Sequence, residues 1–253
     1  MMLDATALAT MGAAIFGASV LSGIFGMAGG LILLGVLLLY VDVVPGMVLF
    51  GAIQVTAGSY RAALWMKHVR WDIVWRYLLG ATVAFVIMRW VRFVPDKAFI
   101  YIALGIMPFA AELLPRSLTP DITRPGVPFF CGILLQSMQL MAGATGVVFD
   151  MFFQKAMLDR KTIIGTKSIV QVAGHAMRVG YFASLAATLD FGLPWWAFAG
   201  AIVLAIAGTQ IAGMILERMS DAGFRSWSWR LIYSVSGLYV LRGLWLMTEG
   251  WRG

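Results

Sequence analysis

Two glutamine–arginine pairs stand out in the sequence because such side chains are rare inside long apolar stretches. Gln54 precedes Arg61 by seven residues, and the pair returns 117 positions later as Gln171 and Arg178. Residues seven apart share a face of an α-helix, so each amide points the same way as its guanidinium. Guanidinium groups bind oxyanions in a forked geometry, and an amide can orient them. The pattern predicts two helix faces suited to a small anion, unless the long arginines reach the headgroups instead.

Glycine clusters precede both pairs. The same offset carries Gly26 and Gly29 onto Gly143 and Gly146, and Gly30 follows in the first copy. A helix that restarts inside a membrane presents unpaired backbone N–H groups and the positive end of its dipole, and glycine lets an anion approach this backbone closely. Broken helices at matching places of two halves are typical of the binding site of a transporter. The alternative is close packing of helices through small residues.

The composition is that of a membrane protein. Of 253 residues, 61% are hydrophobic and 12% are charged, half of the ~25% charged residues that soluble proteins average. The apolar runs suit membrane-spanning helices, and no alternating ten-residue pattern indicates a β-barrel. We expect an all-α, polytopic helical membrane protein with about 8 to 10 membrane segments, located in the inner (plasma) membrane.

Charge and cysteine content exclude several function classes. The net charge of +7 arises from Lys and Arg in short connections, where the positive-inside bias and anionic headgroups explain them, so we expect no nucleic acid partner. Cys131 is the single cysteine, and His68 and His175 stand in different contexts, so neither a metal cluster nor a nucleophile with its base indicates an enzyme. We expect no cofactor. The expected partners are a small anionic substrate and the lipid bilayer, with a homodimer left open.

A polar linker rich in proline divides the chain into two repeats. We place the first transmembrane repeat at 1–115, the linker at 116–126 and the second repeat at 127–253. If the short limbs after the glycine breaks cross the membrane, each half has five passes and the halves are inverted. If the limbs are re-entrant, each half has four passes. The five-pass scheme gives the steeper excess of Lys and Arg on one side, and therefore favours inverted repeats.

Four other side chains near the breaks could take part. His175 shares the face of Gln171, either as a structural hydrogen-bonding residue or as a proton carrier. Lys167 either contacts the substrate or reaches the headgroups. Asp150 either forms a structural ion pair or carries a proton, and Thr145 could donate a hydroxyl hydrogen bond. The predicted substrate-binding residues are Gly26, Gly29, Gly30, Gln54, Arg61, Gly143, Thr145, Gly146, Lys167, Gln171, His175 and Arg178.

The chain resembles the sulfite exporter TauE/SafE family, also called the toluenesulfonate uptake permease family. The resemblance rests on a basic chain with a central polar linker and on the glycines Gly23, Gly26, Gly29, Gly30, Gly143 and Gly146. The glycine run is interrupted by Met27 and Ala28, and the second copy contains Ala144 and Thr145. The resemblance implies a secondary carrier of sulfur-containing anions such as sulfite, sulfoacetate or other small organosulfonates.

We therefore expect a transporter that works by alternating access. The anion would bind near the midplane between the two repeats, held by both glycine breaks and both glutamine–arginine pairs. An anion channel, or a carrier of another small organic anion, is the alternative, because similar groups could line a pore.

Overall fold

The fold is entirely helical in the part that the computed structural model describes, residues 5–25, 28–113, 115, 119–143, 145–185, 195–216 and 221–250. This part contains ten α-helices, a short 3-10 helix and no strand, which confirms the all-α prediction. The elements are α1 (Ala5–Phe25), α2 (Ala28–Tyr40), α3 (Val43–Leu64), η1 (Met66–His68), α4 (Trp71–Val91), α5 (Lys97–Leu113), α6 (Val127–Ala142), α7 (Gly146–Phe153), α8 (Arg160–Ala183), α9 (Trp195–Leu216) and α10 (Asp221–Gly250).

Several helices are long and apolar enough to cross a membrane. Within the described residues, three segments meet this requirement by length and composition: Val43–Leu64, Trp71–Val91 and Arg230–Glu249. Shorter apolar stretches occur in α1, α2, α6 and α9. These helices indicate an integral membrane protein, while the number of spans stays a prediction.

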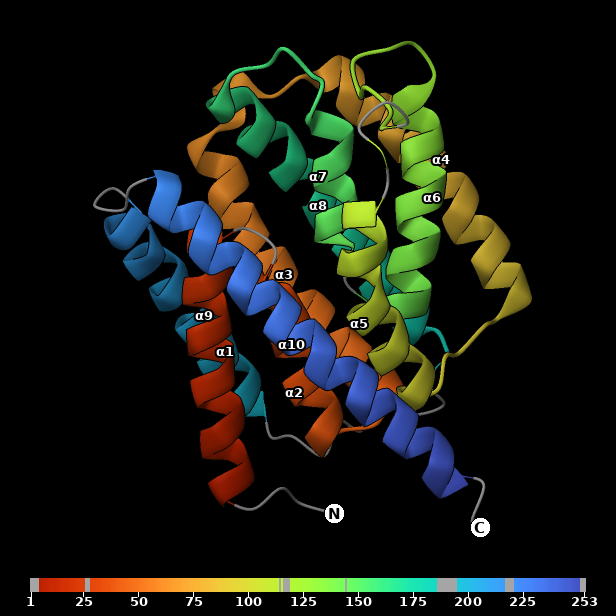
Figure 1. The fold of residues 1–253 in the computed structure, drawn as a ribbon, viewed down its shortest axis with the longest axis vertical. Helices are drawn as coiled ribbons and strands as arrows, with labels where there is room; N and C mark the ends of the chain where they lie inside the picture. The colour runs from red at the N-terminus through yellow and green to blue at the C-terminus, as the bar shows by residue number, and fades with distance from the viewer. Residues whose placement is uncertain are drawn as a thin grey trace.

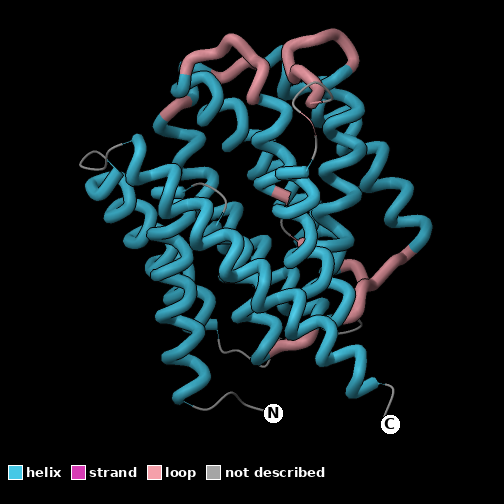
Figure 2. The backbone as a smooth tube through the Cα atoms, viewed as in Figure 1, coloured by secondary structure: helices cyan, strands magenta, loops and turns pink. Residues whose placement is uncertain are grey.

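The helices alternate in direction along the long axis of the molecule (Figure 1). In the first half, α1, α3 and α5 run upward in this view and α2 and α4 run downward. In the second half, α6, α8 and α10 run downward and α7 and α9 run upward. The described connections gather at two ends (Figure 2), with 41–42 and 92–96 at the lower end and 65–70, 119–126 and 154–159 at the upper end.

The limbs that follow the two glycine breaks are short. α2 has 13 residues and α7 has 8, which at 1.5 Å per residue gives about 20 and about 12 Å, less than the ~30 Å hydrocarbon core. The limb lengths are thus typical of re-entrant segments. The helix directions in Figure 1, in contrast, are those of the five-pass scheme.

Helix boundaries and packing follow the offset of the glutamine–arginine pairs. α1 ends at Phe25 and α6 at Ala142, and α3 begins at Val43 and α8 at Arg160, each 117 positions apart. The contacts correspond as well, because α1 packs on α9 as α6 packs on α4, and α2 touches α10 as α7 touches α5. Corresponding helices run in opposite directions in Figure 1.

α3 and α8 cross at the centre of the bundle and form its most extensive helix contact. Glycines make this approach possible, since a Cβ on Gly51 would lie 2.7 Å from Val179 Cγ2 and one on Gly58 would lie 2.9 Å from Val172 Cγ2. Small residues let helix axes approach closely in a membrane protein. The crossing therefore brings the two glutamine–arginine pairs into one region.

Candidate functional site

Arg178 is a fully buried cap on the broken end of α6. Its Nη2 donates hydrogen bonds to the carbonyl oxygens of Gln139, at 2.8 Å, and Gly143, and the side chain has 0% exposure. The last carbonyls of a helix lack partners within that helix, and a cation near them also interacts favourably with the helix dipole. Arg178 thus stabilises the second break by donating to the Gly143 carbonyl, and it adds a second donor to the Gln139 carbonyl, which also accepts the Gly143 backbone N–H.

His175 lies beside this cap. Its Nδ1 accepts hydrogen bonds from the Gln139 amide at 3.2 Å and from Arg178 Nη1 at 3.3 Å. The Phe50 ring of α3 stands edge-on to the imidazole, with 5.6 Å between ring centroids, and Arg178 Cζ is 4.9 Å from the centroid of the same ring. Because two groups donate hydrogen bonds to Nδ1, this nitrogen carries no proton, and the arrangement suits a neutral imidazole with its proton on Nε2.

Arg61 makes the corresponding contact in the first half. Its Nη1 donates to the carbonyl oxygen of Ser22 at 3.2 Å, and Ser22 stands 117 positions before Gln139. Each arginine therefore pairs with the last turn of the broken helix in its own half. Arg61, however, is only partly buried and borders a cavity.

This cavity, which we call the basic cavity, has a volume of about 540 Å³ and lies between α1, α3, α8 and α9. Its lining includes three cationic side chains, Arg61, Arg160 and Lys161, together with polar Tyr60 and Gln210. None of its described lining residues is acidic. The volume lies within the usual range for small-molecule sites, and a positive lining attracts anions. The basic cavity is therefore suited to a small anion.

A second large cavity has a different character. It has a volume of about 570 Å³ and lies between α5, α6 and α7, with apolar residues such as Leu134, Met138 and Phe152 in its lining. No charged side chain lines it among the described residues. It offers no partner to an anion, and the basic cavity is the better candidate site.

Lys167 forms an ion pair with Asp150 of α7. The side chains of Lys167 and Asp150 are 17% and 34% exposed, so the pair is only partly enclosed by protein. Arg61 lies close enough for its charge to act on both Lys167 and His175. The crossing of α3 and α8 thus gathers basic groups from both halves around one carboxylate.

The predicted glutamines lie near the crossing. A Cβ on Gly30 would lie 3.0 Å from Gln54 Nε2, which places this amide against the backbone at the start of α2. Gln171 is partly buried on α8, one turn before His175. Gln54 therefore lies beside the first break, as the sequence predicts.

The predicted glycines shape the breaks. Gly29 leaves no room for a side chain, because a Cβ there would collide with the backbone of α1. Gly143 has a φ of 95°, a left-handed conformation that favours glycine. Gly146 begins α7 after Thr145, which is buried and makes no capping hydrogen bond. Gly26 lies outside the described residues.

Two buried amides in α6 were not among the predicted site residues. Gln136 and Gln139 are 0% and 5% exposed, and Gln136 Nε2 donates to the carbonyl oxygen of Gly174 at 3.5 Å. Two amides three residues apart in an apolar helix, directly before a glycine break, would have been the signal. Arg160 and Lys161 were also missed as site residues, because a basic turn is typical of a membrane interface.

One further identity at the same offset joins Asp42 and Asp159, which precede α3 and α8. Asp159 caps α8 by accepting hydrogen bonds from the backbone N–H groups of Lys161 and Thr162, at 3.0 and 3.1 Å. The hydroxyl of Thr162 also donates to this carboxylate and lowers the pKa of Asp159. Asp42 makes no capping bond and instead pairs with Lys97, with 3.6 Å between Nζ and Oδ1.

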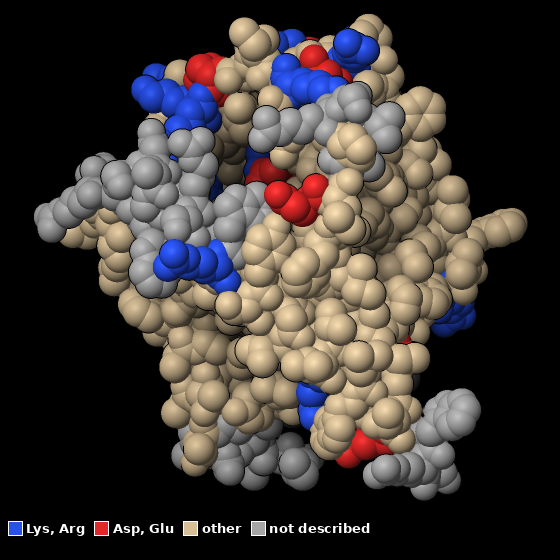
Figure 3. All heavy atoms as spheres, in the orientation of Figure 1, with Lys and Arg blue, Asp and Glu red and all other residues tan. Residues whose placement is uncertain are grey.

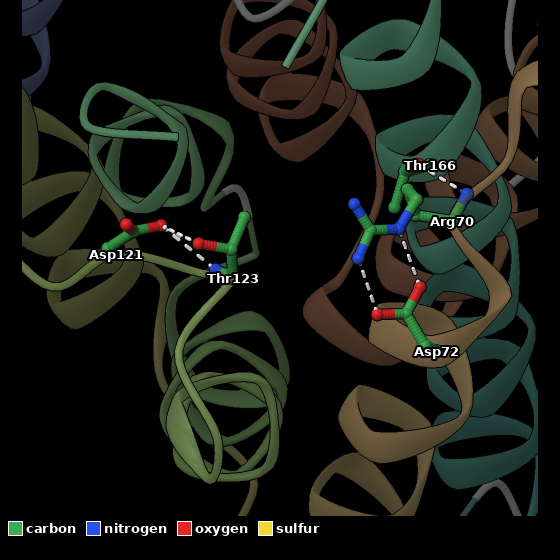
Figure 4. Close-up of polar contacts among 5 residues, drawn as sticks. All are labelled: Arg70, Asp72, Asp121, Thr123 and Thr166. Carbon is green, nitrogen blue, oxygen red and sulfur yellow. Dashed lines mark hydrogen bonds and ion pairs between the residues drawn. The ribbon is translucent and has the colours of Figure 1, made fainter. Parts of the chain in front are cut away.

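Connections at the upper end fix α8 and the linker. Figure 4 shows the guanidinium of Arg70 forked onto Asp72, with both N···O distances at 2.7 Å, while the Arg70 backbone N–H donates to Thr166 Oγ1 at 3.0 Å. In the linker, the backbone N–H and hydroxyl of Thr123 donate to Asp121, and the backbone bond lowers the pKa of Asp121. The bond from Arg70 to Thr166 holds the turn before α4 against α8, the helix that carries Lys167.

The lining of the basic cavity is positively charged, which suits an anion. Among the residues described, no group of three His, Cys, Asp or Glu side chains could hold a metal ion. Figure 3 shows that basic side chains on this face gather towards the upper end of the molecule, with fewer below. The arrangement can attract, orient and release an anion.

A comparison with protein families agrees with this reading. The family model described as "Sulfite exporter TauE/SafE" matches residues 11–239 of the chain. Neither the curated proteins nor the solved structures gave a match. The matched range includes both glycine breaks, both glutamine–arginine pairs and all lining residues of the basic cavity. It confirms the resemblance that the glycine-rich helix end predicts.

Proposed function

Because the chain belongs to the sulfite exporter TauE/SafE family, we propose that it is a secondary transporter of sulfite or of a small organosulfonate such as sulfoacetate. The family implies an integral membrane protein that exports sulfite or a related sulfur anion. Its members are transporters rather than enzymes, in keeping with a site that binds without transforming.

The observation that carries this proposal is the basic cavity. Three cations line it, no acidic residue is among its described lining residues, and one of the cations, Arg61, also pairs with the end of broken helix α1. A guanidinium matches the oxygen geometry of a sulfite or sulfonate group, and Lys161 adds a mobile positive charge. We place the substrate in this cavity, with Arg61 at its inner end.

The orientation of the cavity supports export. The described connections at the upper end carry Lys67, Arg70, Arg124 and Lys155, whereas those at the lower end carry Arg92. By the positive-inside rule the upper end faces the cytoplasm. Since Arg160 and Lys161 begin α8 at that end, the basic cavity would collect its anion from the cytoplasm.

Alternating access follows from the arrangement of the halves. We propose that the halves are inverted repeats, which is supported by matching helix boundaries, exchanged packing partners and opposite helix directions. Two inverted halves can rock against each other and expose one site to either side in turn. The glycine-lined crossing of α3 and α8 would be the pivot.

Uptake into liposomes containing the purified protein tests the proposal. We expect saturable uptake of labelled sulfite or sulfoacetate, accelerated by unlabelled anion on the opposite side. Arg61→Gln should lower this exchange about 10- to 100-fold, because a charge-assisted contact is worth about 1.5–3 kcal/mol. Arg89→Gln, at an exposed position outside the basic cavity, is the matched control. Flux that never saturates would instead favour an anion channel.

A further inference from the structure

The ion pair of Asp150 and Lys167 has no counterpart in the first half. The positions 117 residues earlier are Leu33 and Phe50, which are 1% and 0% exposed. The offset that preserves glycines, glutamines and arginines therefore replaces two apolar core residues by a carboxylate and an ammonium. Since an apolar pair occupies these positions in the first half, the framework does not need the charges for packing, and a buried pair adds little net stability.

The pair links α8 to the short limb that begins at the second break. Asp150 lies on α7, which is this limb, and Lys167 lies on α8, one turn before Gln171. Both side chains are partly accessible. A change in the charge of either group would break the ion pair that connects α8 to α7.

The surroundings leave Asp150 with one nearby ionic partner among the described residues. α6 carries no charged or histidine side chain, and Asp150 is the single charged residue of α7. On α5, Lys97 pairs with Asp42 and Glu112 stands in the last turn. In the adjoining connections Asp121 is held by Thr123, and Lys155 and Asp159 lie beyond the end of α7. The remaining titratable groups at the crossing are the cations Lys167, Arg178 and Arg61 and the neutral imidazole of His175.

We propose that Asp150 is the proton site of the transporter. Its carboxylate is the counter-ion of Lys167 until an anion takes its place. When the carboxylate takes up a proton, the ammonium of Lys167 loses its counter-ion and donates a hydrogen bond to an oxygen of the anion. The site has no net charge as an Asp150–Lys167 pair, and none as protonated Asp150 with Lys167 and one anionic oxygen group. One proton therefore travels with the anion and cancels one of its negative charges. This inference rests on the proposed transport function.

Proton-coupled accumulation in liposomes tests this inference. Sulfoacetate is the probe, because its two acidic groups stay ionised at neutral pH, and a trapped pH dye reports proton movement. One negative charge crosses with each sulfoacetate and its proton, so the membrane potential is clamped at zero with potassium and valinomycin. With wild-type protein, an acidic outside should then drive accumulation about tenfold for each pH unit, as expected for one coupled proton. Asp150→Asn should lose this dependence and the dye signal, while it still exchanges labelled for unlabelled sulfoacetate. The control Asp121→Asn, in the linker, should behave as wild type.

The outcomes separate the two proposals. No exchange of either sulfoacetate or sulfite by wild-type protein refutes the transport function itself. Exchange without pH-driven accumulation, or pH-driven accumulation that survives in Asp150→Asn, overturns the role of Asp150 alone. Should Asp150→Asn fail to fold, the double variant Asp150→Leu with Lys167→Phe, which copies the first half, replaces it. Proton-driven accumulation by that variant would likewise overturn the inference.

Discussion

Each break is accompanied by an arginine at the repeated position, but Arg61 and Arg178 lie in different environments. Arg178 is enclosed, and its guanidinium binds Gln139, Gly143 and His175. Arg61 makes a single described hydrogen bond, to Ser22, and borders the basic cavity. A repeated motif therefore does not imply a repeated role. In the second copy the arginine caps the end of the broken helix, whereas in the first copy the guanidinium borders a cavity.

Replacing Arg178 should give the largest effect on stability. Arg178→Leu leaves the Gly143 carbonyl oxygen without its described partner in a buried place, whereas the Gln139 carbonyl keeps its bond from the Gly143 backbone N–H. An unpaired buried group costs about 1–3 kcal/mol, and we expect a loss of that size in the free energy of unfolding. Thermal unfolding in detergent, with Arg178→Lys as the conservative variant, measures it. A stable Arg178→Leu protein would remove the contrast between the breaks.

Replacing Arg61 should affect binding more than folding. Arg61→Leu loses one hydrogen bond at a partly exposed position, which costs about 0.5–1.5 kcal/mol. We expect the unfolding temperature to change little, while the binding of sulfite and sulfoacetate, measured by ligand-induced thermal shift, disappears. If Arg61→Leu unfolds as easily as Arg178→Leu, the first arginine is a structural cap as well.

The sequence was informative where structure depends on local residue types. Apolar runs and glycines predicted the helices and both breaks, and a short limb, α2, follows the first break at Ala28–Tyr40. The glycine at a left-handed φ and the amide beside Gly30 also lie at predicted positions. These features follow from backbone freedom and helix periodicity, which a short window of sequence contains.

The unequal roles of the arginines could not be predicted, because they depend on contacts between distant segments. Arg178 donates hydrogen bonds to carbonyl oxygens 35 and 39 residues away. No sequence pattern predicts a hydrogen bond from a side chain to such a distant backbone group. The basic cavity joins Arg61 to Arg160 and Lys161 across the crossing of α3 and α8. Only the packed structure shows that these two interfacial cations face the same space.

Replacing the Asp150–Lys167 pair should have an effect of intermediate size on stability, and it tests how far the two halves differ. Each single replacement, Asp150→Leu or Lys167→Phe, leaves one charge without its partner, whereas the double variant restores the apolar pair of the first half. We expect the double variant to unfold within about 1 kcal/mol of wild type, and the single variants to be less stable. A double-mutant cycle should give a coupling of about 0.5–3 kcal/mol. Purely additive effects would mean that the ion pair contributes nothing to folding.

The smallest difference concerns the aspartates that precede α3 and α8. Asp159 accepts hydrogen bonds from Thr162 and Lys161, which lower its pKa, whereas Asp42 is exposed and makes no capping bond. Because the folded pKa of Asp159 lies below its unfolded value of about 4, its contribution is present above that pH and is lost as the pH falls through the folded pKa. Thermal unfolding from neutral to acidic pH should therefore show Asp159→Asn less stable than wild type at neutral pH and equal to it in acid. Asp42→Asn should match wild type throughout, because an exposed ion pair contributes little. Equal losses from both replacements would show that the first helix is capped in the same way, and this difference between the halves would disappear.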